Sequence, residues 1–427
     1  MGAERAILVT GADQHQGLAV IRGLGMAGLP VIAAGPGAHS LGFRSRFTID
    51  RGIYTSPSLD PEAFRRDILA ILERTRPALV IPGVESTLVL LDQYRAEIER
   101  YAPLAAASSA ALAVAVDKSA TVHLAGRVGV PAPRSLWYET RKEVFDRVGE
   151  LRFPVALKPR GNALFGQTRH QLGFKVRYAR SVEELHSVLD ALDESAGVPM
   201  IQECVLGTGV CVSAVFDRGK PVVLFPYRRV REVPLSGGVS VLRESIPLDP
   251  RLAAYVTRLL EALEWHGVAM VEFKYSQERD EYTLMEINPR FQASTALSLD
   301  AGLNLPQLVA SLYGCAPRPP LPPYRSGVRE RWLQGDFMAL YQHLREGADP
   351  GPAGNPLFTP PTRMSAVLEF LRDFRPGTKY DEFKAADWRP GLLEAAAIGR
   401  MVVGWGGDAV KAVARRLVGR ARTARPE

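Results

Sequence analysis

The sequence predicts an α/β protein made of several lobes, and three observations support this. The chain opens with a hydrophobic strand at 6–10, a helix that reaches about residue 28 and a second strand at 31–35, which is the order of a βαβ unit. Further strands and helices alternate downstream, with helices expected at 61–75 and about 250–265. The chain has 427 residues, so two or three domains are expected rather than one small core.

The first part of the chain is expected to form a Rossmann-like half. One turn, at 11–17, follows the first strand, and the strand within 77–86 ends in a Pro-Gly turn. Ligands of open α/β sheets bind beyond the carboxyl ends of the strands, so both turns are expected to line one crevice. Glu85 is a candidate substrate contact there, with a solvated loop glutamate as the alternative. The helical pattern that follows stops at Gly-Val-Pro-Ala-Pro, 129–133, and closes this domain.

The second part contains more strands. Ser181 and Glu184 form a capping-box pattern that predicts a helix over about 181–196, with strands on either side of it. Residues 268–290 are expected to form two strands joined by a charged turn. After Gly314 the sequence becomes rich in proline, which is typical of a linker.

Composition narrows the functional class. Hydrophobic residues make up 46% and charged residues 23% of the chain, as in ordinary globular proteins. The formal net charge is +7, and residues 391–427 hold seven Lys or Arg against three acidic residues. The rest of the chain is therefore close to neutral, which suits a small anionic ligand and does not favour a nucleic-acid partner. Three cysteines without a C-x-x-C pair, no signal-peptide pattern and no long apolar run predict a cytoplasmic protein.

The strands within 268–290 carry a candidate metal site. Glu272 lies in the first strand, and Glu286 and Asn288 lie at the end of the second. Residues i and i+2 of a strand point to the same face, so Glu286 and Asn288 present their oxygens side by side. Two carboxylates and an amide suit Mg²⁺, which binds a few carboxylates together with substrate phosphates. Arg290 follows as a fixed positive charge for a phosphate or carboxylate; an ordinary hairpin is the alternative.

A candidate phosphate site lies upstream. Lys158 ends a buried strand and precedes a loop that contains Arg160, Gly161 and Gly166. Backbone N–H groups of such a loop can cover phosphate oxygens while the lysine supplies charge. Lys118 is a second cation. The strand at 200–205 is suited to hold a flat heteroaromatic ring along its edge.

The order of these motifs is more specific than any one of them. It runs DKSAT, then the Gly-Val-Pro-x-Pro stop, FPVALKPRGN, IQE, VEFK and EINPR. This order resembles the ATP-grasp superfamily, most closely its carboxylate–amine ligase branch, with similarity to D-alanine–D-alanine ligases and biotin carboxylases over about 1–315. The resemblance implies a Rossmann-like pre-ATP-grasp domain at 1–115, a two-lobed ATP-grasp domain at 116–315, and a Pro-rich linker with a C-terminal helical extension at 316–427.

The resemblance also implies roles for individual residues. Lys118 and Lys158 would contact ATP phosphates, and the loop at 160–167 would close over them. The adenine would lie against Gln202, Glu203 and Val205. The ion, Mg²⁺ or alternatively Mn²⁺, would be held by Glu272, Glu286 and Asn288. Arg290 would steady the transferred phosphate. Apart from the resemblance, the cluster of Arg228, Arg229 and Arg231 suits carboxylates and phosphates, which predicts a wall over the reacting carboxylate that includes Arg228; a solvated basic hairpin is the alternative. Cys211 stands where an acidic residue for the ribose is expected.

These roles predict an ATP-dependent ligase that forms an amide bond through an acyl-phosphate, with amino acids or peptides as substrates. A non-catalytic nucleotide-binding protein on the same fold is one alternative. An NAD(P)-dependent oxidoreductase is another, which the missing G-x-G-x-x-G spacing disfavours. A homodimer is also an expectation. The C-terminal residues Arg415, Arg416, Arg420 and Arg422 suggest either contact with an acidic membrane surface or a solvated helix.

Overall fold

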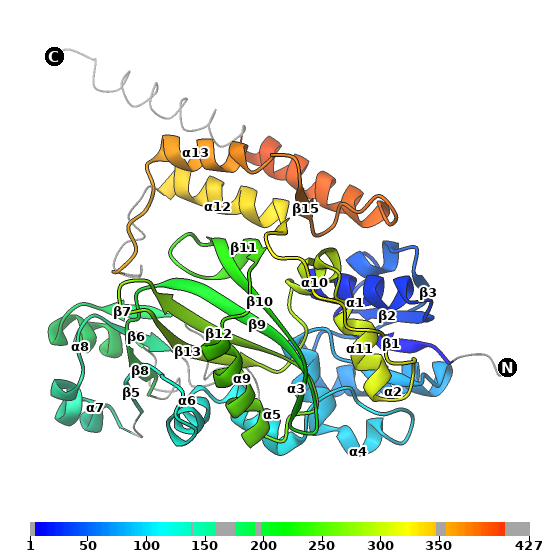
Figure 1. Ribbon diagram of the computed structural model, residues 1–427, viewed down its shortest axis with the longest axis horizontal. Helices are drawn as coiled ribbons and strands as arrows, with labels where there is room; N and C mark the ends of the chain where they lie inside the picture. The colour runs from blue at the N-terminus through cyan, green and yellow to red at the C-terminus, as the bar shows by residue number, and fades with distance from the viewer. Residues whose placement is uncertain (1–4, 138–139, 159–175, 193–197, 347–355, 406–427) are drawn as a thin grey trace, which may run out of the picture.

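Three β-sheets organise the chain. The computed structural model describes residues 5–137, 140–158, 176–192, 198–346 and 356–405. Figure 1 shows the first domain at one end, a small sheet with α7 and α8 at the other, and a long twisted sheet between them. This arrangement is the α/β architecture with separate lobes that the sequence predicts.

The first sheet is parallel, with strand order β3-β2-β1-β4. Its strands are β1 (Ile7–Val9), β2 (Val31–Gly35), β3 (Thr48–Ile53) and β4 (Leu79–Ile81), and its helices include α1 (His15–Met26), α2 (Pro61–Thr75) and α3 (Glu85–Gln93). The βαβ opening and the helix at 61–75 are confirmed. Asp60 explains where α2 starts, because its side chain accepts a hydrogen bond from the backbone N–H of Ala63.

Close backbone approach joins the two turns at the carboxyl end of this sheet. A Cβ on Gly83 would lie 2.1 Å from the carbonyl oxygen of Thr10, and one on Gly17 would lie 2.1 Å from that of Gly11. Only glycine fits such contacts. The turns after β1 and β4 therefore lie side by side, as the sequence predicts.

The second sheet is antiparallel and small, with order β5-β8-β6-β7. It consists of β5 (Ser135–Leu136), β6 (Val155–Lys158), β7 (Arg177–Ala179) and β8 (Met200–Glu203), with α7 (Arg141–Arg147) and α8 (Val182–Asp190) packed beside it. Ser181 caps α8 as predicted, since its hydroxyl accepts from the N–H of Glu184. The helix ends at Asp190, before the predicted end at 196.

The third sheet has seven strands, in the order β13-β12-β9-β10-β11-β14-β15. They are β9 (Thr208–Asp217), β10 (Lys220–Val233), β11 (Val239–Ser245), β12 (Gly267–Ser276), β13 (Glu281–Asn288), β14 (Arg329–Arg331) and β15 (Thr378–Tyr380). The pairing of β12 with β13 confirms the expected two-stranded unit at 268–290. The helix expected at about 250–265 is α9 (Pro250–Ala262).

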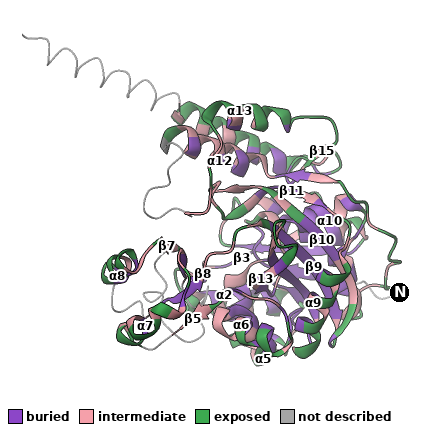
Figure 2. Cartoon of the chain, turned by 60° about the vertical axis from the view of Figure 1, so that its left-hand side comes forward, coloured by how far each residue is buried: buried purple, intermediate pink, exposed green. Residues whose placement is uncertain are grey.

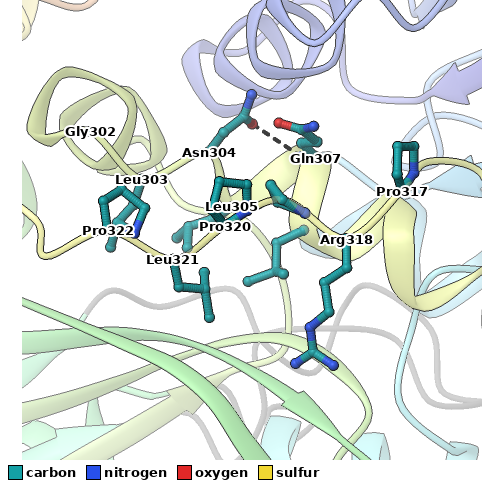
Figure 3. A pocket seen from close by; sticks show the side chains of 12 residues that line it. Gly302, Leu303, Asn304, Leu305, Gln307, Pro317, Arg318, Pro320, Leu321 and Pro322 are labelled. Carbon is teal, nitrogen blue, oxygen red and sulfur yellow. Dashed lines mark hydrogen bonds between the residues drawn. The ribbon is translucent and has the colours of Figure 1, made fainter.

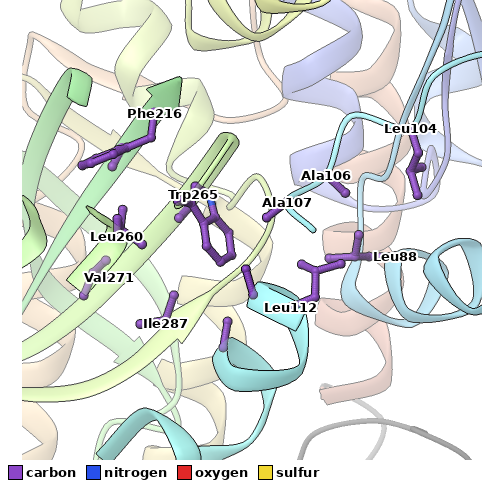
Figure 4. Packing of buried hydrophobic residues seen from close by; sticks show 14 of the residues in the cluster. Leu88, Leu104, Ala106, Ala107, Leu112, Phe216, Leu260, Trp265, Val271 and Ile287 are labelled. Carbon is purple, nitrogen blue, oxygen red and sulfur yellow. The ribbon is translucent and has the colours of Figure 1, made fainter. Parts of the chain in front are cut away.

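A continuous hydrophobic core joins the first domain to the long sheet. Trp265 is fully buried and belongs to the same cluster as Leu112 of α5 (Ser109–Val116) and Phe216 of β9. Figure 4 shows Trp265 between the sheet residues and the loop at Ala107. Figure 2 shows buried residues concentrated in the sheets, with exposed residues on the outer faces of α7, α8 and α13. The parallel sheet and its helices thus pack directly against the sheet that carries the acidic residues.

The C-terminal part is built into this sheet. We expected a linker and a helical extension after residue 315, and the helices are present as α12 (Leu333–Glu346) and α13 (Arg363–Arg372). However, β14 pairs with β11 and β15 pairs with β14, so the sheet does not end at residue 315. The expectation of an appended extension is corrected in this respect. The basic residues after Trp405 lie outside the described residues.

Candidate active site

The acidic residues lie on the paired strands β12 and β13. Glu272 is directly opposite Glu286, and Met270 is opposite Asn288. The Asn288 side-chain amide donates a hydrogen bond of 2.8 Å to a carboxylate oxygen of Glu286, so these i, i+2 side chains share one face. Glu272 and Asn288 are buried, at 8% and 5% exposure. The three predicted metal ligands thus form one compact group of hard oxygen donors, which fits Mg²⁺.

Lys118 approaches this group from the first domain's side. It is the first residue of α6 (Lys118–Arg127), which packs against β13. The side chain of Asp117 fixes the start of α6 by accepting hydrogen bonds from the N–H groups of Ser119 and Ala120. The Lys118 ammonium lies 3.9 Å from a carboxylate oxygen of Glu286. The cap of one helix therefore places a cation beside the acidic pair.

Lys158 ends β6 in the small sheet. Its ammonium donates a 2.6 Å hydrogen bond to the side-chain oxygen of Gln202 on the adjacent strand β8. Gln202 in turn donates to the Ser135 hydroxyl at 3.1 Å. Burial and, to a smaller extent, the nearby charge of Lys118 lower the pKa of Lys158 to about 8, while Glu286 and Glu272 act in the opposite direction. Lys118 and the two glutamates therefore act electrostatically on the pKa of Lys158.

The two carboxylates have different protonation behaviour. Burial raises the pKa of Glu272 to about 7, against the effect of the Arg229 guanidinium and with a contribution from Glu286. Burial would also raise the pKa of Glu286, but Lys118 and the hydrogen bond from Asn288 outweigh it and lower that pKa below its usual value. Glu286 is therefore the firmly ionised member of the pair.

Arg229 is a site residue that the sequence prediction did not select. Its guanidinium contacts the carboxylate of Glu272 and lies 3.4 Å from that of Glu232. Arg228, which we expected at the reacting carboxylate, is 52% exposed at its side chain and donates to Glu244 instead. The structure brings Arg229, and not Arg228, to the acidic group.

Strand register explains this difference. Cys211 lies directly opposite both Glu272 and Tyr227, and directly opposed residues of an antiparallel pair share a face. Arg229 is two positions beyond Tyr227 and so shares that face, whereas Arg228 points to the other. The alternation of side chains along β10 shows that Arg228 and Arg229 point to opposite faces. Only the pairing of β10 with β9, and of β9 with β12, shows which of these faces also carries Glu272. Cys211 is fully buried, and burial raises the pKa of its thiol to about 12.

Arg290 links the site to the first domain. Its guanidinium Nε lies 3.6 Å from a carboxylate oxygen of Glu85, the first residue of α3. Burial raises the pKa of Glu85, although Arg290 acts against this and Glu286 adds to it. A small pocket reaches from the first domain to the β12–β13 pair and is lined by Glu85, Ala115, Val116, Lys118, Thr121, Glu286, Ile287, Asn288 and Pro289. Glu85 therefore lies at the site and is not a solvated loop residue.

The residues expected around adenine lie on or just after β8. Gln202 is buried, with 1% exposure. Glu203 accepts a 3.0 Å hydrogen bond from the backbone N–H of Arg152, and Val205 is partly buried. The expected phosphate loop, including Arg160, Gly161 and Gly166, lies outside the described residues.

A larger pocket of about 530 Å³ lies elsewhere. It is formed by α11 (Leu305–Leu312), the residues before it and the proline-rich segment 317–322. Figure 3 shows apolar side chains such as Leu305 and Leu321 around it, with Asn304 directed to Gln307. It contains none of the predicted site residues.

Comparisons with known proteins identify a family model that matches part of this chain. Residues 198–335 match the family described as "ATP-grasp in the biosynthetic pathway with Ter operon". This segment contains Arg229 and all three predicted metal ligands. Within the described residues, no helix is long and apolar enough to cross a membrane.

Two curated relatives and one solved structure illustrate what this chain is similar to. The chain is 28% identical over 199 residues to an N5-carboxyaminoimidazole ribonucleotide synthase of Synechococcus elongatus, covering 45% of this chain and only 47% of that relative. It is 24% identical over 286 residues to a D-alanine–D-alanine ligase of Lawsonia intracellularis, covering 62% of this chain and 88% of the relative. The solved ADP complex of an N5-carboxyaminoimidazole ribonucleotide synthetase superposes with a TM-score of 0.61 at 15% identity, covering 86% of this chain and 96% of that one. The matched segment and the superposition show that this chain has an ATP-grasp fold.

Proposed function

We propose that this chain is an ATP-dependent carboxylate–amine ligase that forms an amide bond and releases ADP and phosphate. The observation that carries the proposal is the ion pair of Lys118, from α6, with Glu286, which lies directly opposite Glu272 in the long sheet. Lys158, from the small sheet, is within electrostatic reach of the same carboxylates. Cations suited to phosphate and oxygens suited to Mg²⁺ thus converge from three parts of the fold.

The chain's residues would act mainly by position and charge. A carboxylate reacts poorly with an amine because oxide is a poor leaving group. Transfer of the γ-phosphoryl group of ATP to a carboxylate oxygen would give an acyl-phosphate, which an amine then attacks while phosphate leaves. Lys118 and Lys158 would offset the negative charge on the phosphoryl oxygens, and Arg290 would hold the transferred group. No side-chain nucleophile is required for this chemistry.

Glu272, Glu286 and Asn288 would hold the Mg²⁺ ion. When bound, the ion supplies positive charge next to the ATP phosphates. Arg229 contacts Glu272 and so would set both the orientation of this ligand and the pH at which it is ionised. We assign to Arg229 the position near the reacting carboxylate that was predicted for Arg228.

Small carboxylates and amines, such as amino acids or short peptides, are the proposed substrates. The relative named as a D-alanine–D-alanine ligase supports this class. Glu85 and Glu286 line a small pocket, which places the proposed phosphoryl-transfer site next to the turn after β4. A homodimer and a cytoplasmic location remain parts of the proposal.

The test is a phosphate-release screen over pairs of amino acids and dipeptides with ATP and Mg²⁺, with products identified by mass. Glu286→Gln serves as the inactive reference, and Glu281→Gln, on the exposed part of the same strand, serves as the matched control. We expect one or more pairs to give phosphate together with a product of the condensed mass. ATP binding by the chain without any turnover across a broad screen would favour the non-catalytic alternative.

A further inference from the structure

A second group of potential metal ligands lies where α1 meets the segment after β15. His15 is the first residue of α1, and Asp381 and Glu382 directly follow β15. One donor atom of each residue lies within 4.8 Å of those of the other two. His15 contacts Glu382 through its Nδ1 atom, although 367 positions separate them in the sequence. The fold alone brings these three side chains together.

Both carboxylates are removed from solvent. Asp381 is 4% exposed and Glu382 is 0% exposed. Arg243 contacts one oxygen of Asp381, and His15 contacts one oxygen of Glu382. The other oxygens, Asp381 Oδ2 and Glu382 Oε2, are buried and have no hydrogen-bond partner within the described residues. A buried carboxylate oxygen is unfavourable unless it binds a donor or a cation, so both oxygens are suited to a metal.

The backbone that carries the two acids is held in place. Arg22 of α1 donates to the carbonyl oxygens of Asp381 and Glu382, at 2.5 and 2.8 Å. It also pairs with the side chain of Asp387 at 2.8 Å. Arg22 and Asp387 are both buried, so the segment is anchored to the same helix that begins with His15. Ligands on a rigid, well-supported backbone favour metal binding.

The imidazole is supported as well. The ring of Trp332 lies 4.4 Å from that of His15, centroid to centroid. His15 keeps 20% side-chain exposure, so an ion can reach it from solvent. Solvent therefore reaches the imidazole of His15 but not the two carboxylates.

We propose that His15, Asp381 and Glu382 bind a divalent transition-metal ion, with Zn²⁺ or Mn²⁺ as the matching class, which fastens α1 to the segment after β15. An imidazole nitrogen with two carboxylates suits these ions, whereas Mg²⁺ prefers oxygen ligands alone. This site differs in ligands and place from the Mg²⁺ site at Glu272, Glu286 and Asn288. It does not depend on the proposed ligase activity.

The experiment measures metal content and thermal stability of the full chain. All variants carry Glu286→Gln, which weakens metal binding at the β12–β13 site. Bound metal is removed with a chelator, and the protein is dialysed against a small excess of Zn²⁺ or Mn²⁺. Elemental mass spectrometry then measures the number of ions bound per chain. We expect one ion per chain and a rise of the melting temperature on metal addition. His15→Ala and Glu382→Gln should each lower the affinity about tenfold or more and abolish the rise.

Two matched controls separate this site from chance binding. His266→Ala removes a histidine that pairs with Asp217 and not with the proposed ligands, and Glu278→Gln removes an exposed glutamate, so both variants should keep the ion. Circular dichroism checks that each variant is folded, and His15→Gln replaces His15→Ala if that variant is not. The proposal is overturned if the parent chain binds no stoichiometric Zn²⁺ or Mn²⁺. It is equally overturned if a folded His15 variant binds these ions as tightly as its parent, since the His15–Glu382 contact is then an ordinary hydrogen bond.

Discussion

Glu272 on β12 lies directly opposite Glu286 on β13, and the pKa values of the two carboxyl groups are shifted in opposite directions. Burial raises the pKa of Glu272 to about 7. The charge of Lys118 and a hydrogen bond from Asn288 keep Glu286 ionised despite its burial. Protons near neutral pH therefore compete with a metal ion for Glu272 but not for Glu286.

Replacing Glu286 tests the metal assignment directly. Glu286→Gln keeps the size and the hydrogen-bonding ability of the side chain but removes the charge that faces Lys118. We expect Mg²⁺-dependent ATP affinity to fall about tenfold or more, and ATP turnover to be lost, because a neutral amide is a poor Mg²⁺ ligand. Calorimetric titration of ATP with and without Mg²⁺ measures the first effect. Unchanged Mg²⁺ dependence in a folded variant, with Glu281→Gln as reference, would show that the ion binds elsewhere.

The raised pKa of Glu272 predicts a pH dependence of Mg²⁺ binding. Glu272 is protonated below about pH 7 and ionised above it, and a carboxyl group must be ionised to bind the metal. The apparent Mg²⁺ affinity should therefore increase between about pH 6 and pH 8, approaching about tenfold per pH unit at the acidic end. Glu272→Gln should remove this dependence along with most of the affinity. A flat profile in the unmodified chain would contradict the assignment of Glu272 as a ligand.

Lys158 should limit ATP binding at higher pH. Its pKa is lowered to about 8 by burial and by Lys118, so the chain without nucleotide loses this positive charge as the pH rises through 8. ATP affinity should fall above that pH, and Lys158→Arg should bind ATP with a flatter profile. Lys158→Met should weaken ATP binding about tenfold or more, which is typical of a lost hydrogen bond to a charged group. Lys220→Met, at the exposed start of β10, is the control, and equal ATP affinity of the two variants would refute the role of Lys158.

Arg229 and Arg228 form a matched pair for mutation. Arg229→Met leaves the buried carboxylate of Glu272 without its main partner, which should raise the pKa of Glu272 further. Mg²⁺-dependent ATP binding at neutral pH should weaken and recover partly at higher pH, and the free energy of unfolding should fall by about 3 kcal/mol. Arg228→Met removes only a largely exposed pair with Glu244 and should change stability by less than about 1 kcal/mol. Equal behaviour of the two variants in titration and denaturation would exclude the special role of Arg229.

Local sequence patterns were sufficient for some elements and not for others. The strands β1 and β2, the helix α2 and the β12–β13 pair have clear hydrophobic periodicity or caps, and all are present. By contrast, β14 consists of Arg329, Glu330 and Arg331, of which the last two are fully buried. Burial of such residues depends on partners distant in sequence, such as Lys384 at 2.8 Å from Glu330. No local pattern reveals a strand whose neighbours are decided by tertiary contacts.

The same limit applies to the site residues. The spacing of Glu286 and Asn288 predicted their shared face, because it depends only on the period of a strand. The choice between Arg228 and Arg229 depended on how β10 pairs with β9, and β10 contains register shifts. The neighbours His15 and Glu382 could not be paired from sequence at all, since the intervening chain contributes strands to all three sheets.

Asp336 of α12 connects the C-terminal helices to the sheet that carries Arg229, so its replacement tests whether these helices stabilise the sheet. Its side chain is fully buried and accepts hydrogen bonds from Arg231 of β10, at 2.5 and 2.7 Å, and from Arg331 of β14, at 2.6 Å. Asp336→Ala leaves two arginines without this partner, so the free energy of unfolding should fall by about 3–5 kcal/mol. Denaturant unfolding measures this loss, with Glu369→Gln on the exposed face of α13 as control. ATP binding should weaken too, because Arg231 is two residues from Arg229 on the same strand. A loss below about 1 kcal/mol would show that α12 and α13 are an independent extension after all.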